Sequence, residues 1–332
     1  MRAARLHGAR DLRLHDEPPP VPGAGAALVR VEAVGLCGSD LHWFEEGAIG
    51  GTGIVHALVP GHEFAGRTGD GRLVAVDPAI HCGRCRLCRE GHPNLCPEVR
   101  FAGHGSVDGA LREWLAWPEH NLVPLPEGYT AADGAMLEPL GVAIHAVDLA
   151  HLRTGDSVGV FGCGPIGLFC LQVARAAGAA RLLATDLPSR PHRLQAARAA
   201  GATVFAAEAG SEAEAVARAA GGLGLDVAIE CAGSQAAVDA AVESVRPGAR
   251  VVLAGIPSDE RTSIRAAAAR RKGLTVAFSR RMKQVYPRAI ALVDAGRVDL
   301  RSVVSHRLPL SEAARAFELA ASRESLKVIV EP

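Results

Sequence analysis

The chain lacks net charge and has few aromatic residues. Its 332 residues carry 36 Lys and Arg against 36 Asp and Glu, and Phe, Trp and Tyr together make up only 4%. Proteins that hold nucleic acids need an excess of basic charge, and those that hold single strands also stack bases on aromatic rings. The composition therefore argues against a nucleic-acid partner, and equally against a zinc-bearing nucleic-acid module.

Long apolar runs are also absent. No run reaches the ~18 residues that a transmembrane helix needs. The first 20 residues are charged and then rich in proline, without the apolar core of a secretory signal. We therefore expect no membrane partner and a cytoplasmic location. In a reducing compartment the eight cysteines favour metal binding or catalysis over disulfides.

The length and texture of the chain predict two domains. Single hydrophobic cores stop growing near ~250–300 residues, whereas this chain has 332 residues, of which 48% are hydrophobic. Up to about residue 145, short β-like runs such as residues 27–33 and 72–76 alternate with turns rich in Gly and Pro. This pattern is typical of an irregular, mostly β domain.

From residue 148 onward the pattern changes to alternating strands and helices, which predicts a parallel sheet with right-handed crossovers. The last residues, 303–332, return to strand-like and short helical pieces, with Ser311 as the expected N-cap of a helix and Glu312 in its first turn. The expected strands are residues 157–161, 181–185, 226–230, 250–254 and 274–278, and the expected helices are 167–177, 193–200, 212–220 and 235–245.

The first of these strands runs into a glycine motif that is typical of dinucleotide binding. Gly162, Gly164 and Gly167 are spaced Gly-x-Gly-x-x-Gly, with Pro165 and Ile166 before the third glycine. The glycines allow a tight turn, a close approach of the backbone to a pyrophosphate, and close packing of helix on strand. The following helix then presents its N-terminus to the phosphates. The alternative is a glycine-rich turn of an α/β protein that holds no nucleotide.

An acidic residue follows at the distance expected for a ribose contact. Asp186 ends the second strand, 19 residues beyond Gly167. A carboxylate there accepts hydrogen bonds from the ribose hydroxyls and repels a 2′-phosphate, which favours NAD over NADP. Arg190 and Arg193 lie close by in the sequence and could instead hold a 2′-phosphate. We therefore expect NAD, with NADP as the less favoured cofactor.

Four cysteines lie within fifteen residues, and their spacing indicates a metal site. Cys82, Cys85, Cys88 and Cys96 stand in a stretch that is also rich in Arg, Gly and His. Four thiolates in a closed tetrahedron form a structural zinc site that leaves no position for chemistry. A [4Fe–4S] cluster is an alternative, because the first three are spaced Cys-x-x-Cys-x-x-Cys. A second alternative is that the four cysteines are unrelated and simply buried.

A catalytic metal needs an open position, and a second set of residues could provide it. Cys37 follows an apolar run, and His62 and Glu63 stand together after a Pro-Gly turn. One thiolate, one imidazole and one carboxylate give three protein ligands and leave the fourth place to water or a substrate oxygen. Each residue taken alone is ordinary, because a lone histidine is more often a satisfied polar residue than a ligand.

The order of these motifs resembles that of the zinc-containing medium-chain alcohol dehydrogenases, and it is most similar to the branch of sorbitol (polyol) and threonine dehydrogenases. The resemblance covers essentially the whole chain. Its motifs are residues 35–42, 61–63, the four-cysteine loop, 137–140 and 162–167.

The resemblance implies an α/β fold of two domains. Residues 1–146 together with 288–332 would form a mostly β, GroES-like catalytic domain that binds zinc. Residues 147–287 would form a Rossmann domain, with a doubly wound parallel sheet that binds NAD. The resemblance further implies two zinc ions per chain.

The resemblance also assigns roles to individual residues. Cys37, His62 and Glu63 would bind the catalytic zinc, and Glu138 would ligate it directly or hydrogen-bond its water. Asp40 would be the carboxylate that orients His62, as metal-binding imidazoles generally require.

The implied reaction is hydride transfer from an alcohol to NAD. The zinc would lower the pKa of the alcohol, so that an alkoxide forms on the metal near neutral pH. Ser39 and His42 match the family's proton relay from the substrate hydroxyl toward solvent. The hydride would then pass to the nicotinamide, which the Rossmann domain holds against the same carbon.

Three features depart from the pattern of the family. Residues 66–76 form a shorter segment than usual before the four-cysteine loop. Trp43 stands where the branch often carries Tyr, and the Arg-Tyr pair that contacts polyol substrates is matched here by Arg281 and Met282. Trp43 and Arg281 are therefore our candidates for substrate contact.

We expect a zinc-dependent and NAD-dependent dehydrogenase of a small secondary alcohol, with a polyol or sugar alcohol as substrate, that forms a homo-oligomer, either a dimer or a tetramer. One alternative is an amino-alcohol dehydrogenase of the threonine type, in which Arg281 pairs with a substrate carboxylate. A second alternative is another alcohol dehydrogenase activity of the same family. From a different class comes a quinone-reductase-like binding module without catalytic zinc, against which Cys37, His62 and Glu63 argue.

Overall fold

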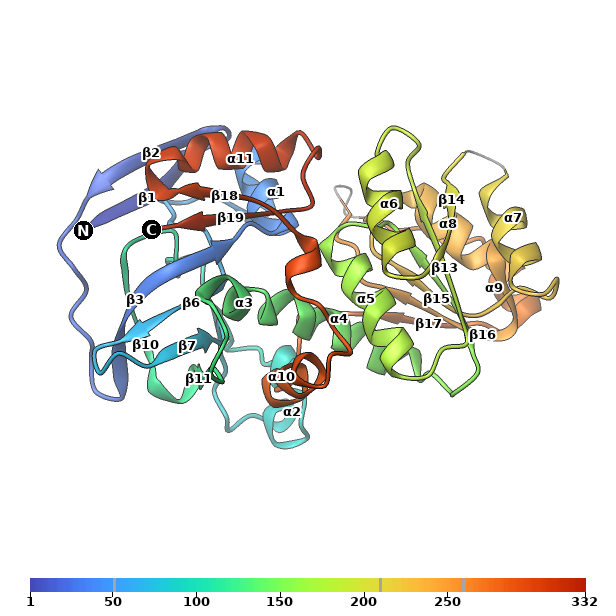
Figure 1. The fold of residues 1–332 in the computed structure, drawn as a ribbon, viewed down its shortest axis with the longest axis horizontal. Helices are drawn as coiled ribbons and strands as arrows, with labels where there is room; N and C mark the ends of the chain where they lie inside the picture. The colour runs from blue at the N-terminus through green and yellow to red at the C-terminus, as the bar shows by residue number, and fades with distance from the viewer. Residues whose placement is uncertain (50–51, 209–210, 258–260) are drawn as a thin grey trace. The chain divides into compact units, whose positions relative to one another are not determined.

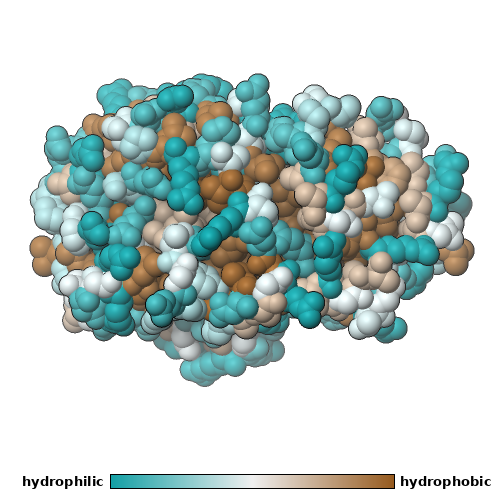
Figure 2. Space-filling view, in the orientation of Figure 1, coloured by the Kyte–Doolittle hydropathy of each residue, from teal (hydrophilic) through white to brown (hydrophobic). Residues whose placement is uncertain are grey.

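The computed structural model describes residues 1–49, 52–208, 211–257 and 261–332. Within it the chain forms two compact units (Figure 1), one of Met1–Glu138 with Val304–Pro332 and the other of Pro139–Val303. No helix in the described ranges is long and apolar enough to cross a membrane. Hydrophilic residues are spread over the visible face of each unit (Figure 2).

The first unit is built on a mostly antiparallel sheet. Its central strand alternates as a half-buried strand should, with Val29 and Val31 buried and Arg30 exposed between them. The strands in spatial order are β11 (Leu122–Pro124), β7 (Leu73–Val76), β6 (Glu63–Thr68), β3 (Ala26–Gly35), β19 (Lys327–Glu331) and β18 (Val304–Pro309), and β10 (Trp114–Pro118) also pairs with β3.

The C-terminus of the chain belongs to this first unit. β19 pairs with β3, with Ile329 opposite Gly35, and α11 (Ala313–Ala321) packs beside β18 and β19 (Figure 1). This return places the last residues beside the strands that carry the candidate metal ligands. The smaller elements of the unit are β1 (Arg2–Gly8), β2 (Asp11–Asp16), α1 (Gly38–Glu46), β4 (Ala48–Ile49), β5 (Thr52–Gly53), β8 (Ala79–Ile80), α2 (Arg86–Arg89), β9 (Arg100–Phe101) and α3 (Ala131–Ala135).

The second unit contains the expected parallel sheet, with strand order β14-β13-β12-β15-β16-β17. Numbered along the chain, this is the order 3-2-1-4-5-6 that is typical of dinucleotide-binding sheets. Helices α5 and α6 lie in front of the sheet and α8 and α9 behind it (Figure 1). The strands are β12 (Ser157–Phe161), β13 (Arg181–Asp186), β14 (Thr203–Ala206), β15 (Leu225–Glu230), β16 (Val245–Leu253) and β17 (Thr275–Phe278). The helices are α5 (Pro165–Ala176), α6 (Pro191–Ala199), α7 (Glu212–Ala219), α8 (Gln235–Ser244), α9 (Ala266–Lys272) and α10 (Tyr286–Asp294).

The expected strands and helices of this unit are all present, with bounds that differ by a few residues. The sequence did not predict β14, a short strand whose side chains are at most half-buried, nor the helices α9 and α10. One other expectation was wrong, because Ser311 does not cap a helix. It lies in a 3₁₀ turn, Leu310–Glu312, and α11 begins at Ala313 with Glu312 in the N-cap position. The short turn after Pro309 shifts the N-cap, and so the start of the helix, by one residue.

The two compact units and the expected domain limits divide the chain at different places. The units separate after Glu138 and after Val303, whereas the expected limits lie at 146/147 and 287/288. Helix α4 (Leu137–Ala150) runs through the first of these regions without a break. The boundary between the units therefore falls inside a helix. The expected limits of the catalytic and cofactor-binding domains stay a prediction.

A glycine controls how closely two strands of the first unit approach each other. A Cβ atom on Gly66 of β6 would overlap the carbonyl oxygen of Arg30 on β3, whereas a Cβ on Gly69 would meet nothing within 4 Å. Both residues lie on or just after the same strand. They therefore form a matched pair for testing the register of β3 and β6.

We predict that Gly66→Ala lowers the thermal midpoint by roughly 5–10 °C, because the backbone has to move by overpacking worth ~3 kcal/mol. Gly69→Ala should change stability by less than about 0.5 kcal/mol. Thermal unfolding followed by circular dichroism measures both. Equal midpoints for the two variants would contradict the close approach of the strands.

Candidate active site and metal sites

A buried aspartate connects the two loops that carry the candidate ligands. Asp40, in the first turn of α1, is fully buried. Its Oδ2 accepts the backbone N–H of Cys37 at 2.9 Å, and its Oδ1 accepts the N–H of Gly61 at 3.2 Å. Oδ1 also lies 3.4 Å from Nδ1 of His62. A single carboxylate therefore positions Cys37, before α1, and His62, before β6.

The charges around this carboxylate are consistent with that role. Burial acts to raise the pKa of Asp40, but His62 and the hydrogen bond from Cys37 hold that pKa below its usual value. Burial acts to lower the pKa of His62, but the Asp40 carboxylate and the Cys37 thiol raise it well above its usual value. Asp40 is thus an anion that fixes the neighbouring imidazole.

Within the described part of the chain, Cys37, His62 and Glu63 each bring one ligand atom within 4.8 Å of the others. The three come from two loops more than twenty residues apart, and His62 and Glu63 are buried. Bond lengths of about 2.0–2.3 Å place the ligands of one zinc ion at separations inside this limit. The residues present therefore fit a zinc ion with three protein ligands.

The sequence reading missed the residue that pairs with Glu63. Lys327, at the start of β19, is 3% exposed, and its Nζ lies 2.7 and 2.6 Å from the two carboxylate oxygens of Glu63. Burial acts to lower the pKa of Lys327, but the Glu63 carboxylate raises it above its usual value. A Cβ on Gly35 would overlap Oε2 of Glu63, so this glycine leaves room for the pair. The available signal was a lone lysine at the head of an apolar strand.

The other predicted residues of this site lie close to the three. Ser39 is buried, and its Oγ lies 3.4 Å from Nε2 of His62. His42 follows one turn later on α1, where its Nδ1 pairs with Glu46 at 2.9 Å. Burial raises the pKa of Glu138 to about 8; the nearby His62 lowers that pKa and the charge of Glu63 raises it. Among the described residues, Glu138 is not part of the converging group of ligand atoms.

Aromatic side chains line one side of His62. The rings of His62 and Phe101 are 5.3 Å apart, and those of His62 and His104 are 5.7 Å apart, centroid to centroid. Trp43 meets His104 edge-on at 5.7 Å and is 1% exposed, so the predicted substrate residue packs in the core of the unit. Phe101 and His104 carried no motif that the sequence reading could have used.

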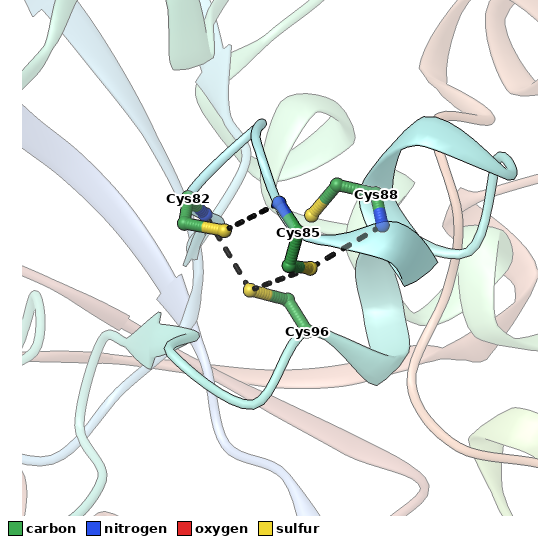
Figure 3. Close-up of side chains that lie close together, drawn as sticks. All are labelled: Cys82, Cys85, Cys88 and Cys96. Carbon is green, nitrogen blue, oxygen red and sulfur yellow. Dashed lines mark hydrogen bonds between the residues drawn. The ribbon is translucent and has the colours of Figure 1, made fainter.

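The four cysteines meet as the sequence predicts. Figure 3 shows Cys82, Cys85, Cys88 and Cys96 with their thiol groups turned toward one another. The four sulfurs lie within 4.8 Å of one another, and those of Cys85 and Cys96 are 4.0 Å apart. A single zinc ion fits such a spacing, whereas an iron–sulfur cubane interposes four iron atoms and holds the cysteine sulfurs farther apart.

The loop also supplies hydrogen bonds to the sulfurs. The backbone N–H of Cys85 donates to Cys82 at 3.3 Å, and that of Cys88 donates to Cys85 at 3.4 Å. Hydrogen bonds from Arg84 and Cys85 lower the pKa of Cys82 to about 7, whereas burial and the neighbouring thiols raise the pKa of Cys88 to about 12. Four adjacent thiolates require a cation, and a zinc ion would fit this role.

The second unit forms the predicted glycine turn between β12 and α5. Gly162 has a φ of +100°, and a Cβ on it would lie 2.7 Å from the backbone N of Ala232. A Cβ on Gly167 would overlap the carbonyl oxygen of Gly162. Gly164 is the N-cap of α5, with Pro165 and Ile166 in its first turn. A Cβ on Gly164 would meet nothing nearer than a guanidinium nitrogen of Arg193, at 3.9 Å.

Two carboxylates at strand ends hold the loops that flank this turn. Asp186 accepts the backbone N–H of Cys163 at 2.7 Å and that of Leu187 at 2.8 Å. Glu230, which the sequence reading missed, accepts the N–H of Ala232 at 2.7 Å and that of Gly233 at 2.6 Å.

The predicted basic residues of the second unit lie at two places. Arg190 is the N-cap of α6, and Arg193 follows in the same helix with its guanidinium near Gly164. Arg281 has a φ of +53°, in the left-handed region, and is half-buried. An arginine held in this conformation is a candidate functional residue.

Comparison with known proteins places these observations in a family. Residues 23–127 match the model of the alcohol dehydrogenase GroES-like domain, and residues 165–295 match the model of the zinc-binding dehydrogenase. The chain is 33% identical to sorbitol dehydrogenase of Bacillus subtilis, over 100% of its own length and 97% of the relative. It is 34% identical to D-xylulose reductase A of Aspergillus niger, over 98% of its own length and 95% of the relative.

Solved structures agree over the same length. A zinc-binding dehydrogenase from Sinorhizobium meliloti bound to NADP matches with a TM-score of 0.90 and 31% identity, over 100% of this chain and 99% of that one. A short chain alcohol dehydrogenase from Escherichia coli complexed with NADH matches with a TM-score of 0.90 and 26% identity, over the same shares of the two chains.

The chain therefore belongs to the zinc-containing medium-chain alcohol dehydrogenases, oxidoreductases that combine a GroES-like domain with a Rossmann-like domain. Within this family it falls in the branch of the sorbitol dehydrogenases. The two-domain α/β fold expected from the sequence is confirmed.

We predict that Cys85→Ser lowers the thermal midpoint by roughly 5 °C or more, because a structural metal site contributes directly to folding. Unfolding is measured with and without a strong chelator. After chelation the variant and the wild type should unfold at the same temperature. A difference that survives chelation would show that Cys85 acts by packing and not through a metal.

We predict that Gly164→Ala weakens NADH binding by at least ~10-fold without lowering stability, because the new methyl group meets the pyrophosphate rather than the protein. Gly167→Ala is the matched control and should lower the thermal midpoint, because its Cβ has no room. Titration calorimetry and thermal unfolding measure the two effects. Unchanged NADH affinity in Gly164→Ala would contradict the assignment of this glycine turn as the pyrophosphate site.

Proposed function

We propose that the chain oxidises a secondary alcohol, a polyol or sugar alcohol, by transferring a hydride to NAD. The observation that carries this proposal is the convergence of the thiol of Cys37, the imidazole of His62 and the carboxylate of Glu63. A set of this kind can hold a zinc ion through three protein ligands and leave a fourth position for substrate. When bound, zinc supplies a Lewis acid that lowers the pKa of an alcohol, and NAD supplies the hydride acceptor.

The surrounding residues prepare this site. Asp40 holds the backbone of Cys37 and the ring of His62 in place, so the ligands need little rearrangement. We assign Ser39 as the first acceptor of the substrate's hydroxyl proton and His42, one helical turn along α1, as the group that passes it toward solvent. The buried carboxyl of Glu138 would hydrogen-bond water at the site or ligate the metal.

The remaining predicted sites complete the proposal. The four-cysteine loop would hold a second, structural zinc, which makes two per chain. The turn of Gly162, Gly164, Pro165, Ile166 and Gly167 would hold the pyrophosphate, and Asp186 would hold the adenosine ribose. Arg190 and Arg193 would line the same subsite. The expected limits, 1–146 with 288–332 and 147–287, would separate the catalytic from the cofactor domain.

The substrate class rests on the relatives. Sorbitol dehydrogenase and D-xylulose reductase are among them, which supports a polyol. We assign Trp43 and Arg281 as the residues that contact the substrate. An amino-alcohol substrate of the threonine type remains the second candidate, because Arg281 would then pair with a carboxylate. By analogy with the family we also propose a homo-oligomer, a dimer or a tetramer, in the cytoplasm.

A substrate panel tests the reaction and separates the candidates. Purified protein is offered sorbitol, xylitol, other polyols and L-threonine with saturating NAD or NADP, and NAD(P)H absorbance is followed. We expect polyol turnover, with NAD preferred over NADP. Turnover of L-threonine alone would favour the threonine type. No turnover of any secondary alcohol would contradict both.

We predict that Cys37→Ala lowers kcat/KM at least ~1000-fold, because the substrate loses the Lewis acid that activates it. The affinity for NADH and the thermal midpoint should stay close to those of the wild type, which shows that the fold and the cofactor site are intact. Retained activity in this variant would contradict the assignment of Cys37.

A further inference from the structure

Lys327 and Glu63 form a buried ion pair at the candidate metal site. Both side chains are at most 3% exposed. The Lys327 ammonium donates to Oε1 of Glu63 at 2.7 Å, to Oε2 at 2.6 Å and to the carbonyl oxygen of Leu36 at 2.9 Å. These three acceptors account for all three N–H groups that an ammonium carries.

The pair also ties together the segments that form the site. Leu36 directly precedes Cys37, and Glu63 directly follows His62. Lys327 comes from β19, which pairs with β3 next to Gly35. One ammonium therefore contacts both ligand-bearing loops from a strand near the end of the chain.

Lys327 and a metal ion would compete for the carboxylate of Glu63. Lys327 donates to both oxygens of Glu63, and a metal ion would have to bind at least one of the same two atoms, where the two positive charges repel each other. Two cations therefore share one buried carboxylate. A buried carboxylate without any cation is strongly unfavourable, so one of the two has to stay with it.

We propose that Lys327 is a positioning residue that competes with the catalytic metal for Glu63, holding the carboxylate ready and keeping the site stable before the metal binds. This inference rests on the proposed function, because it takes Glu63 to be a ligand of that metal. Linkage then requires reciprocity: Lys327 weakens metal binding by the same factor by which the metal weakens the pairing of Lys327 with Glu63.

The alternative is that Lys327 is a structural strut. If Lys327 were only a structural contact, its removal would lower stability by the same amount with and without the metal. Its removal would also leave metal affinity unchanged or weaken it. Competition predicts the opposite sign for affinity. The two readings therefore differ in a quantity that does not depend on enzyme activity.

The experiment titrates zinc into metal-depleted full-length protein and follows both binding and thermal unfolding. We expect the first equivalent to fill the four-thiolate site, which offers four ligands, and the second to report on Cys37, His62 and Glu63. Lys327→Met is compared with Lys327→Arg, which keeps the charge. Lys272→Met serves as the matched control, because Lys272 donates to the carbonyl oxygens of Val242, Glu243 and Val245 in the other unit.

With one zinc per chain, we expect Lys327→Met to unfold roughly 5–10 °C below the wild type, because Glu63 has lost its cation. With two zinc ions, at least half of this loss should be recovered. The second zinc should bind at least ~10-fold more tightly than in the wild type. Lys327→Arg should stay near the wild type, and Lys272→Met should lose the same stability at both zinc levels.

A double variant separates competition for the carboxylate from simple repulsion between charges. In the Glu63→Gln background there is no carboxylate to share, so Lys327→Met should no longer tighten zinc binding. An equal tightening in this background would overturn the proposal, and so would a loss of stability in Lys327→Met that zinc does not recover. If the wild type binds no second zinc, the proposed function fails instead.

Discussion

The site depends on one carboxylate that is used three times. Asp40 accepts the N–H groups of Cys37 and Gly61 and lies against Nδ1 of His62. It links two loops that are more than twenty residues apart in the sequence, and Lys327 links the same loops again through Leu36 and Glu63. A buried carboxylate is unfavourable unless its oxygens accept hydrogen bonds. The N–H groups of Cys37 and Gly61 supply these bonds to Asp40. The ligand geometry is therefore a property of the folded unit rather than of the metal.

Much of the fold and of the site was readable from the sequence because local rules dominate there. The strands of the parallel sheet are short apolar runs bounded by turns. In the turn after β12, Gly162 is required by its contact with Ala232 and Gly167 by its contact with the backbone of Gly162. The four cysteines form a site within one loop, so their spacing alone specifies it. In that loop, the residues that meet in space are also close together in the sequence.

The features that the sequence could not reveal depend on long-range packing. Lys327 lies 264 residues from Glu63, and no local pattern links a lysine on the last strand to a carboxylate on β6. His104 likewise meets His62 only in the folded unit, whereas Glu230 binds the backbone N–H groups of Ala232 and Gly233 and lies in no motif that marks it. Ser311 was misread because a single 3₁₀ turn shifted the start of α11. Local propensity cannot distinguish these cases.

The central claim is that Cys37, His62 and Glu63 share one metal ion, separate from that of the four-cysteine loop. The most direct measurement is the number of zinc ions per chain, determined by mass spectrometry of the native protein and of a Cys37→Ser variant. The account predicts two zinc ions in the wild type and one in the variant. Two zinc ions in both proteins, or one in both, would contradict it.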